Sequence, residues 1–123
     1  SSKFNIIRKL NPKDFINSAN GSPEQLLKNI EIWNELSDEI TSKLDTPIKN
    51  SLEILEASKL IAEQLEIHQQ ICLVNFVQII WWRKTKNIDL IKKLENLKSY
   101  LRKNVQPRLA WEITFLKISI EDL

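Results

Sequence analysis

The apolar residues of this chain recur at helical spacing along most of its length. No stretch alternates apolar and polar residues with a period of two, and no β-hairpin signal occurs. The pattern predicts a short helix at 13–19 and then long helices at about 23–44, 48–65, 67–84, 90–105 and 107–120. We therefore predict an all-α fold, a five-helix bundle preceded by a short helical fragment. Residues 1–11 show no period and predict an irregular lead-in.

The predicted helices differ in how their apolar residues are arranged. The helix at 67–84 is apolar nearly all round, which indicates the centre of the core. Ser37 can start a new helix, so 23–44 is either one bent helix or two. Asp45-Thr46-Pro47 is the next stop and start signal. The remaining helices have apolar stripes: Leu26, Leu27, Ile30 and Trp33; Ile48, Leu52, Leu55, Ala62 and Leu65; Leu90, Leu94, Leu97 and Leu101; Leu109, Ile113, Leu116 and Ile120.

The single glycine, Gly21, lies in the segment Ala19-Asn20-Gly21-Ser22-Pro23. Asn20 and Gly21 are both suited to the left-handed conformation that ends a helix. Ser22 can then accept hydrogen bonds from the first free amides of the next helix. Pro23 fits the first helical position, where its missing N–H leaves no bond unmade. The segment predicts a sharp joint between two helices.

Composition and charge narrow the class of protein. A chain of 123 residues, 42% of them hydrophobic, suits a single globular domain. It has no Met even at position 1, which indicates a processed chain or a piece of a longer protein. One cysteine, Cys72, cannot form an internal disulfide, which favours a reducing cytoplasm. The longest apolar run, 71–82, is too short to span a bilayer.

The net charge of +2 is unevenly distributed along the chain. Between Glu24 and Glu66 there are ten acidic and four basic residues. Between Arg83 and Arg108 there are nine basic and two acidic residues. This asymmetry indicates electrostatic complementarity between elements, or a basic face turned toward a partner.

The sequence argues against an enzyme, a metal site and a nucleotide site. One glycine cannot build a phosphate-binding loop. His68 and Cys72 share a helix face, but no other His or Cys is present to complete a zinc site. Carboxylates four residues apart, such as Glu31 and Glu35, are typical of a solvated helix face. We expect no catalytic residue, no metal, no cofactor and no small-molecule substrate.

The segment Trp81-Trp82-Arg83-Lys84 combines aromatic and cationic side chains, as some nucleic-acid-binding surfaces do. Neighbouring residues on a helix point about 100° apart, so at least one indole faces the bundle. Core or subunit packing is therefore favoured over base stacking. The basic stretch 83–108 leaves a helical nucleic-acid-binding module as an alternative.

Two segments resemble one family. The Ala19-Asn20-Gly21-Ser22-Pro23 joint resembles a turn in the small lid domain of clamp-loader ATPase subunits. The segment 105–116, Val-Gln-Pro-Arg-Leu-Ala-Trp-Glu-Ile-Thr-Phe-Leu, is similar to the closing helix of the collar domain in the bacterial clamp loader. Among these subunits the chain is most similar to the delta-prime family of DNA polymerase III. Glu24 stands where ATP-hydrolysing relatives have an ATP-sensing arginine, which fits delta-prime, and gamma/tau is the alternative.

The resemblance implies a structural function in DNA replication. Residues 1–22 would be the end of an AAA+ lid domain, and 23–123 a helical collar domain. The collar would assemble with the gamma/tau and delta subunits, and DNA would be contacted only indirectly, through the assembled complex. We expect Trp82, Arg83, Arg108 and Trp111 at the subunit interface, because aromatic and Arg side chains are enriched there.

Overall fold

Within residues 10–121, which the computed structural model describes, the chain forms helices and no strand. The helices are α2 (Pro12–Ser18), α3 (Pro23–Glu35), α4 (Asp38–Lys43), α5 (Ser51–Gln64), α6 (Ile67–Thr85), α7 (Ile88–Arg102) and α8 (Pro107–Glu121). The all-α class is confirmed. Residues 1–9 of the expected irregular lead-in lie outside the described residues.

The predicted segment 23–44 is two helices, α3 and α4. Leu36 ends α3 in an extended conformation, and the Ser37 hydroxyl accepts a hydrogen bond from the Ile40 amide at 3.3 Å. This cap starts α4 at Asp38. The described residues therefore contain seven helices, and the count of a five-helix bundle is not confirmed.

The joint around Gly21 has the predicted geometry. Asn20 and Gly21 have φ values of +50° and +78°, both left-handed. The Ser22 hydroxyl accepts a hydrogen bond from the Gln25 amide at 3.3 Å, and Pro23 occupies the first helical position. The chain therefore turns from α2 into α3 within four residues.

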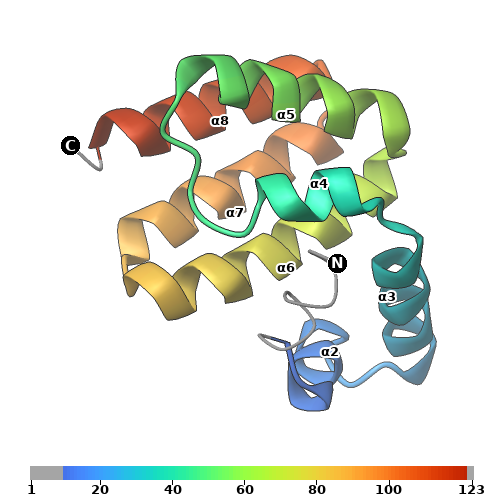
Figure 1. Ribbon diagram of the computed structural model, residues 1–123. Helices are drawn as coiled ribbons and strands as arrows, with labels where there is room; N and C mark the ends of the chain where they lie inside the picture. Colours follow the sequence, from blue (N-terminus) through green and yellow to red (C-terminus); the bar gives the residue numbers. More distant parts are fainter. Residues whose placement is uncertain (1–9, 122–123) are drawn as a thin grey trace.

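Helices α5 to α8 form the main body of the fold, which we call the bundle (Figure 1). In it, α6 packs on α7, α7 on α8, and α8 on α5. Helix α4 lies against α5. We call α2 and α3 the arm; they pack on each other, and α3 also packs on α6. The most apolar predicted helix, α6, thus contacts both the arm and the rest of the bundle.

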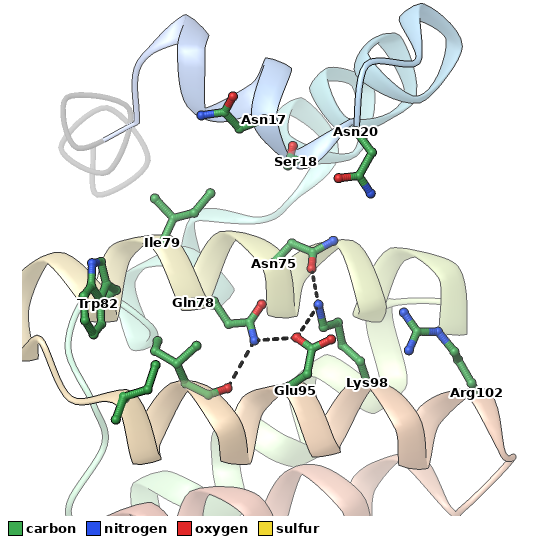
Figure 2. A pocket seen from close by; sticks show the side chains of 12 residues that line it. Asn17, Ser18, Asn20, Asn75, Gln78, Ile79, Trp82, Glu95, Lys98 and Arg102 are labelled. Carbon is green, nitrogen blue, oxygen red and sulfur yellow. Dashed lines mark hydrogen bonds and ion pairs between the residues drawn. The ribbon is translucent and has the colours of Figure 1, made fainter.

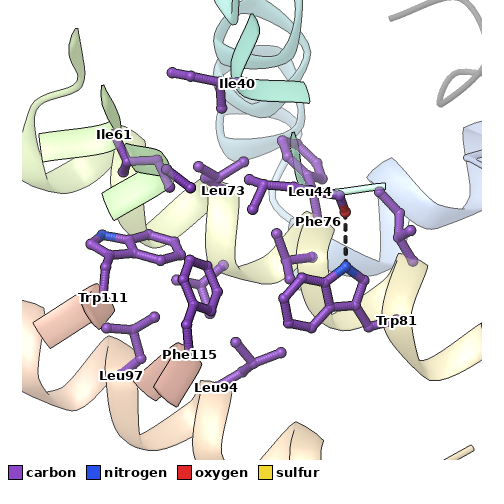
Figure 3. Close-up of a cluster of buried hydrophobic side chains, with 14 of the residues drawn as sticks. Ile40, Leu44, Ile61, Leu73, Phe76, Trp81, Leu94, Leu97, Trp111 and Phe115 are labelled. Carbon is purple, nitrogen blue, oxygen red and sulfur yellow. Dashed lines mark hydrogen bonds between the residues drawn. The ribbon is translucent and has the colours of Figure 1, made fainter. Parts of the chain in front are cut away.

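The bundle core is built around two buried indoles (Figure 3). The Trp81 Nε1 donates a hydrogen bond to the Leu44 carbonyl at 2.8 Å, and the Trp111 Nε1 donates to Gln70 Oε1 at 2.8 Å. Phe115 packs against both rings. The predicted leucines of α7 complete the core, and all four are buried: Leu90, Leu94, Leu97 and Leu101.

The start of α5 differs from the prediction. Pro47 does not open the helix; the Asn50 side chain does, by accepting a hydrogen bond from the Glu53 amide at 3.2 Å. The residues between them form a loop in which Ile48 is buried. The predicted start was therefore about three residues early.

The predicted apolar stripes of α5 and α8 mark mainly an exposed face, and that of α3 is right only at Trp33, since Leu27 and Ile30 are exposed. The buried face of α5 is Ile54, Ala57, Ser58 and Ile61, and that of α8 is Ala110, Trp111, Thr114, Phe115 and Ile118. On α3 the buried residues are Asn29, Ile32 and Trp33. Each of these helices has apolar residues on two sides, so periodicity alone could not select the buried one.

Candidate interaction surface

Helix α8 presents apolar side chains on the side opposite its core face. Leu109, Ile113 and Ile120 are 44%, 37% and 66% exposed. At about 100° per residue they fall on one stripe, roughly opposite Trp111 and Phe115. The predicted stripe on this helix therefore exists, but three of its four residues face solvent, and only Leu116 is partly buried against the core.

Helix α5, which lies beside α8 (Figure 1), also exposes apolar side chains. Leu52 is 64% exposed, and Leu55 is exposed one turn later. We call Leu52, Leu55, Leu109, Ile113 and Ile120 the outer apolar residues. Grouped apolar residues left open on the surface of a soluble domain commonly mark a site of protein–protein contact.

Two of the predicted interface residues lie at the C-terminal end of α6. Trp82 is 38% exposed, and the Lys86 ammonium lies 5.4 Å from the centre of its ring. The Arg83 guanidinium donates a hydrogen bond to Asp14 Oδ1 at 2.6 Å. Asp14 Oδ2 accepts from the Asn11 amide at 2.8 Å, which caps α2. Arg83 therefore holds the arm on the bundle.

The other two predicted residues lie in the first turns of α8. Arg108 is exposed, and its Nε lies 3.2 Å from Glu112 Oε1. Trp111 is fully buried and bonded to Gln70, so in this fold it lies in the core rather than on a surface. The two pairs are not brought together, because the 15-residue helix α7 separates them by about 20 Å.

Glu24 lies in the first turn of α3 and is exposed. A carboxylate there interacts favourably with the positive end of the helix dipole. The same charge disfavours the approach of a phosphate. Glu24 thus has an ordinary structural role at the start of α3, next to the joint at Gly21.

The buried thiol and the histidine form no reactive pair. Burial raises the pKa of Cys72 to about 12, and its Sγ donates to Asn29 Oδ1 at 3.4 Å. His68 is exposed, and its Nδ1 lies 3.5 Å from Glu66 Oε2. In the part of the chain that the structure describes, no group of three or more His, Cys, Asp or Glu residues is placed to hold a metal ion.

Two features of the structure are not revealed by the sequence pattern. Asn29 is a buried polar residue that links three helices, because its Nδ2 also donates to Ser18 Oγ at 3.0 Å. No periodic pattern marks such a residue. The outer apolar residues were noticed as stripes but assigned to the core. The signal that could have identified them is a second apolar stripe on a helix that already has one.

Of the described helices, none is both long enough and apolar enough to cross a membrane.

Comparison with known proteins identifies the family. Residues 3–118 match a family model of a DNA replication protein, a clamp-loader subunit of DNA polymerase III. The chain belongs to this family, described as cyanobacterial DNA polymerase III delta prime, C-terminal domain. Neither the curated proteins nor the solved structures gave a match. The delta-prime resemblance is thus confirmed.

Proposed function

We propose that this chain is a non-catalytic collar domain through which a delta-prime subunit assembles with the gamma/tau and delta subunits of the clamp loader. The observation that carries the proposal is that two neighbouring helices, α5 and α8, both expose apolar side chains, the outer apolar residues. A helix needs one apolar face to pack in its own domain. The second face of α8 is explained by packing against a neighbouring subunit.

The domain boundaries follow the joint at Gly21. We assign residues 1–22 to the end of the lid domain and 23–123 to the collar. The left-handed residues Asn20 and Gly21 support this division, since they separate α2 from α3. Glu24, one turn further on, supports a lid end that does not sense ATP.

Charge supports assembly with neighbours of different character. Helices α3 to α5 carry eight acidic and three basic residues, whereas α6 to α8 carry eight basic and four acidic residues. A subunit with one acidic and one basic region is suited to a ring in which each side contacts a different neighbour. Arg108, exposed beside Leu109, is placed to contribute at the basic side.

The structure weakens the argument for direct nucleic-acid binding. Five of the nine basic residues between Arg83 and Arg108 already pair with an acidic residue of the chain. The pairs are Arg83–Asp14, Lys84–Asp45, Lys93–Glu121, Lys98–Glu95 and Arg108–Glu112. Titration with primed DNA at low and high salt tests this alternative, since phosphate binding weakens steeply with salt. We expect no binding at either salt.

Assembly itself is tested with purified gamma/tau and delta subunits and the 123-residue chain, by size-exclusion chromatography with light scattering. We expect Ile113→Lys and Leu52→Lys to reduce complex formation at least tenfold, because each puts a charge into an apolar contact. Leu27→Lys on α3 is the matched control, since Leu27 is 63% exposed and Leu52 is 64% exposed.

All three variants should retain the circular dichroism of the wild-type chain. Equal complex formation by Ile113→Lys, Leu52→Lys and Leu27→Lys would refute the assignment of this surface. Loss of assembly by Leu27→Lys alone would move the interface to the arm.

A further inference from the structure

A groove of about 660 Å³ lies between the end of the arm and the hairpin formed by α6 and α7 (Figure 2). Asn17 and Asn20 line one wall, at the end of α2 and in the joint that follows it. The other wall is formed by side chains of α6 and α7. This groove is distinct from the outer apolar residues, none of which line it.

The two ends of the groove have opposite character. Trp82 and Ile79 of α6 lie toward one end (Figure 2). Ile88, the first residue of α7, also lines the groove, so this end is apolar. Arg102, in the last turn of α7, lies at the other end (Figure 2). In the part of the chain that the structure describes, the Arg102 side chain makes no hydrogen bond and no ion pair, and its charge contributes to lowering the pKa of Glu95.

Between these ends the walls carry amide side chains with unused hydrogen-bonding capacity. Asn75 Oδ1 accepts from Lys98 Nζ at 2.8 Å, which leaves the Asn75 Nδ2 free to donate. Gln78 Nε2 donates to the Ile91 carbonyl at 3.2 Å and to Glu95 Oε2 at 3.0 Å, which leaves Gln78 Oε1 free to accept. This free donor and this free acceptor, about one turn apart on α6, can pair with the C=O and N–H groups of an extended backbone.

The charges of the groove match a single carboxylate. Lys98 Nζ lies 2.8 Å from Glu95 Oε2, so these two charges offset each other. Arg102 then leaves one net positive charge at its end of the groove. Hydrogen bonds from Gln78 and Lys98 lower the pKa of Glu95, in keeping with its pairing to Lys98, so the unpaired positive charge of the groove is that of Arg102.

We propose that this groove binds an extended segment of another protein, with an apolar side chain at the Trp82 end and a carboxylate at the Arg102 end. From Ile88 to Arg102 the groove follows about 21 Å of helix. An extended chain advances about 3.3 Å per residue, so the segment is about six residues long. The inference is independent of the proposed assembly surface, because it uses other residues.

The probes are six-residue peptides with Leu, Phe or Trp at one end, Asp or Glu at the other, and Ser-Gln-Ser-Gln between, in both orders. They are titrated to 2 mM into the ¹⁵N-labelled 123-residue chain, and amide chemical shifts are followed by NMR. We expect shifts confined to the groove-lining parts of α2, α6 and α7 for at least one order. Replacing the acidic end by Gln should weaken binding at least fivefold.

Charge-reversal variants distinguish peptide binding in the groove from non-specific electrostatic attraction of the peptide to the protein. Arg102→Glu should weaken binding at least tenfold, and Trp82→Ala at least fivefold. Lys103→Glu is the matched control: it makes the same change of charge at an exposed residue that does not line the groove, and it should alter binding less than twofold.

Absence of groove shifts with every peptide at 2 mM overturns the proposal, as does equal weakening by Arg102→Glu and Lys103→Glu. A single-stranded dT12 that shifts the groove amides where no peptide does would show a nucleic-acid site instead. Assembly with gamma/tau and delta is measured for Arg102→Glu and Trp82→Ala as well. If both still assemble, a loss of peptide binding is independent of the proposed function.

Discussion

The bundle and the arm are held together in different ways. In the bundle, α7 inserts a continuous row of buried leucines between α6 and α8. The arm is attached to α6 through a few particular side chains. Phe15 and Trp33 meet Phe76 of α6 edge-on, with ring centroids 5.6 and 5.1 Å apart, and Asp14 meets Arg83. The bundle is thus stabilised by an extensive buried apolar surface, whereas the arm is attached by a small number of side-chain contacts.

This difference predicts two levels of opening. Parts of a protein with few buried contacts open more readily than its core. The arm covers Cys72, whose thiol bonds to Asn29 of α3. Because burial also raises the pKa of Cys72 to about 12, the thiol reacts at pH 8 only after the arm moves away. As the chain has a single cysteine, its labelling rate measures arm opening without interference.

The largest expected effect is in the bundle. Trp111→Ala removes a fully buried indole and leaves Gln70 Oε1 unpaired, so it should lower the free energy of unfolding by about 3–5 kcal/mol. Urea denaturation followed by circular dichroism measures this. Trp82→Ala, on an exposed indole, is the control and should cost less than about 1 kcal/mol. Equal effects of the two substitutions would contradict the assignment of Trp111 to the core.

The next effect is in the arm. Phe15→Ala removes a half-buried ring that packs on both Trp33 and Phe76, at a cost of about 2 kcal/mol. Because the ring is lost only from the closed state, the labelling rate of Cys72 should rise about 30-fold. Trp111→Ala destabilises the closed and arm-open states alike, so it should leave that rate nearly unchanged. If both variants accelerate labelling equally, arm and bundle open as one unit.

A smaller effect comes from the joint. A side chain at Gly21 meets no atom within 4 Å, so Gly21→Ala is penalised only by its φ of +78°. We expect a loss of about 1 kcal/mol in urea denaturation. Gly21→Asn should cost less than half as much, because Asn tolerates this conformation. An alanine variant as stable as the wild type would show that the joint can change its backbone conformation.

The smallest effect is that of the ion pair between arm and bundle. Arg83→Gln and Asp14→Asn, with the double variant, give a double-mutant cycle for the Arg83–Asp14 contact. We expect a coupling of about 0.5–1 kcal/mol in the labelling rate of Cys72, since the Arg83 side chain is partly exposed. A coupling of zero would leave the aromatic contacts as the attachment of the arm.

The same contrast explains what the sequence could predict. The local sequence is sufficient to predict the joint between α2 and α3, because Gly21, Ser22 and Pro23 act through their own backbone and side-chain chemistry. The leucines of α7 were also assigned correctly, since the opposite face of that helix is polar. The faces of α5 and α8 were not, because the choice between two apolar stripes is made by tertiary packing. Asn29 is buried by its partners in three helices, which no local pattern shows.

The two apolar faces of α8 would respond differently to selection. Substitutions at Trp111 or Phe115 change whether the chain folds, so any screen for folded protein detects them. Substitutions at Ile113 or Ile120 expose no new apolar surface, and many would make the isolated chain more soluble. A mutational scan scored by expression would therefore favour polar residues at these positions. If these residues contact a neighbouring subunit as proposed, a scan scored by cell growth would instead retain the apolar ones.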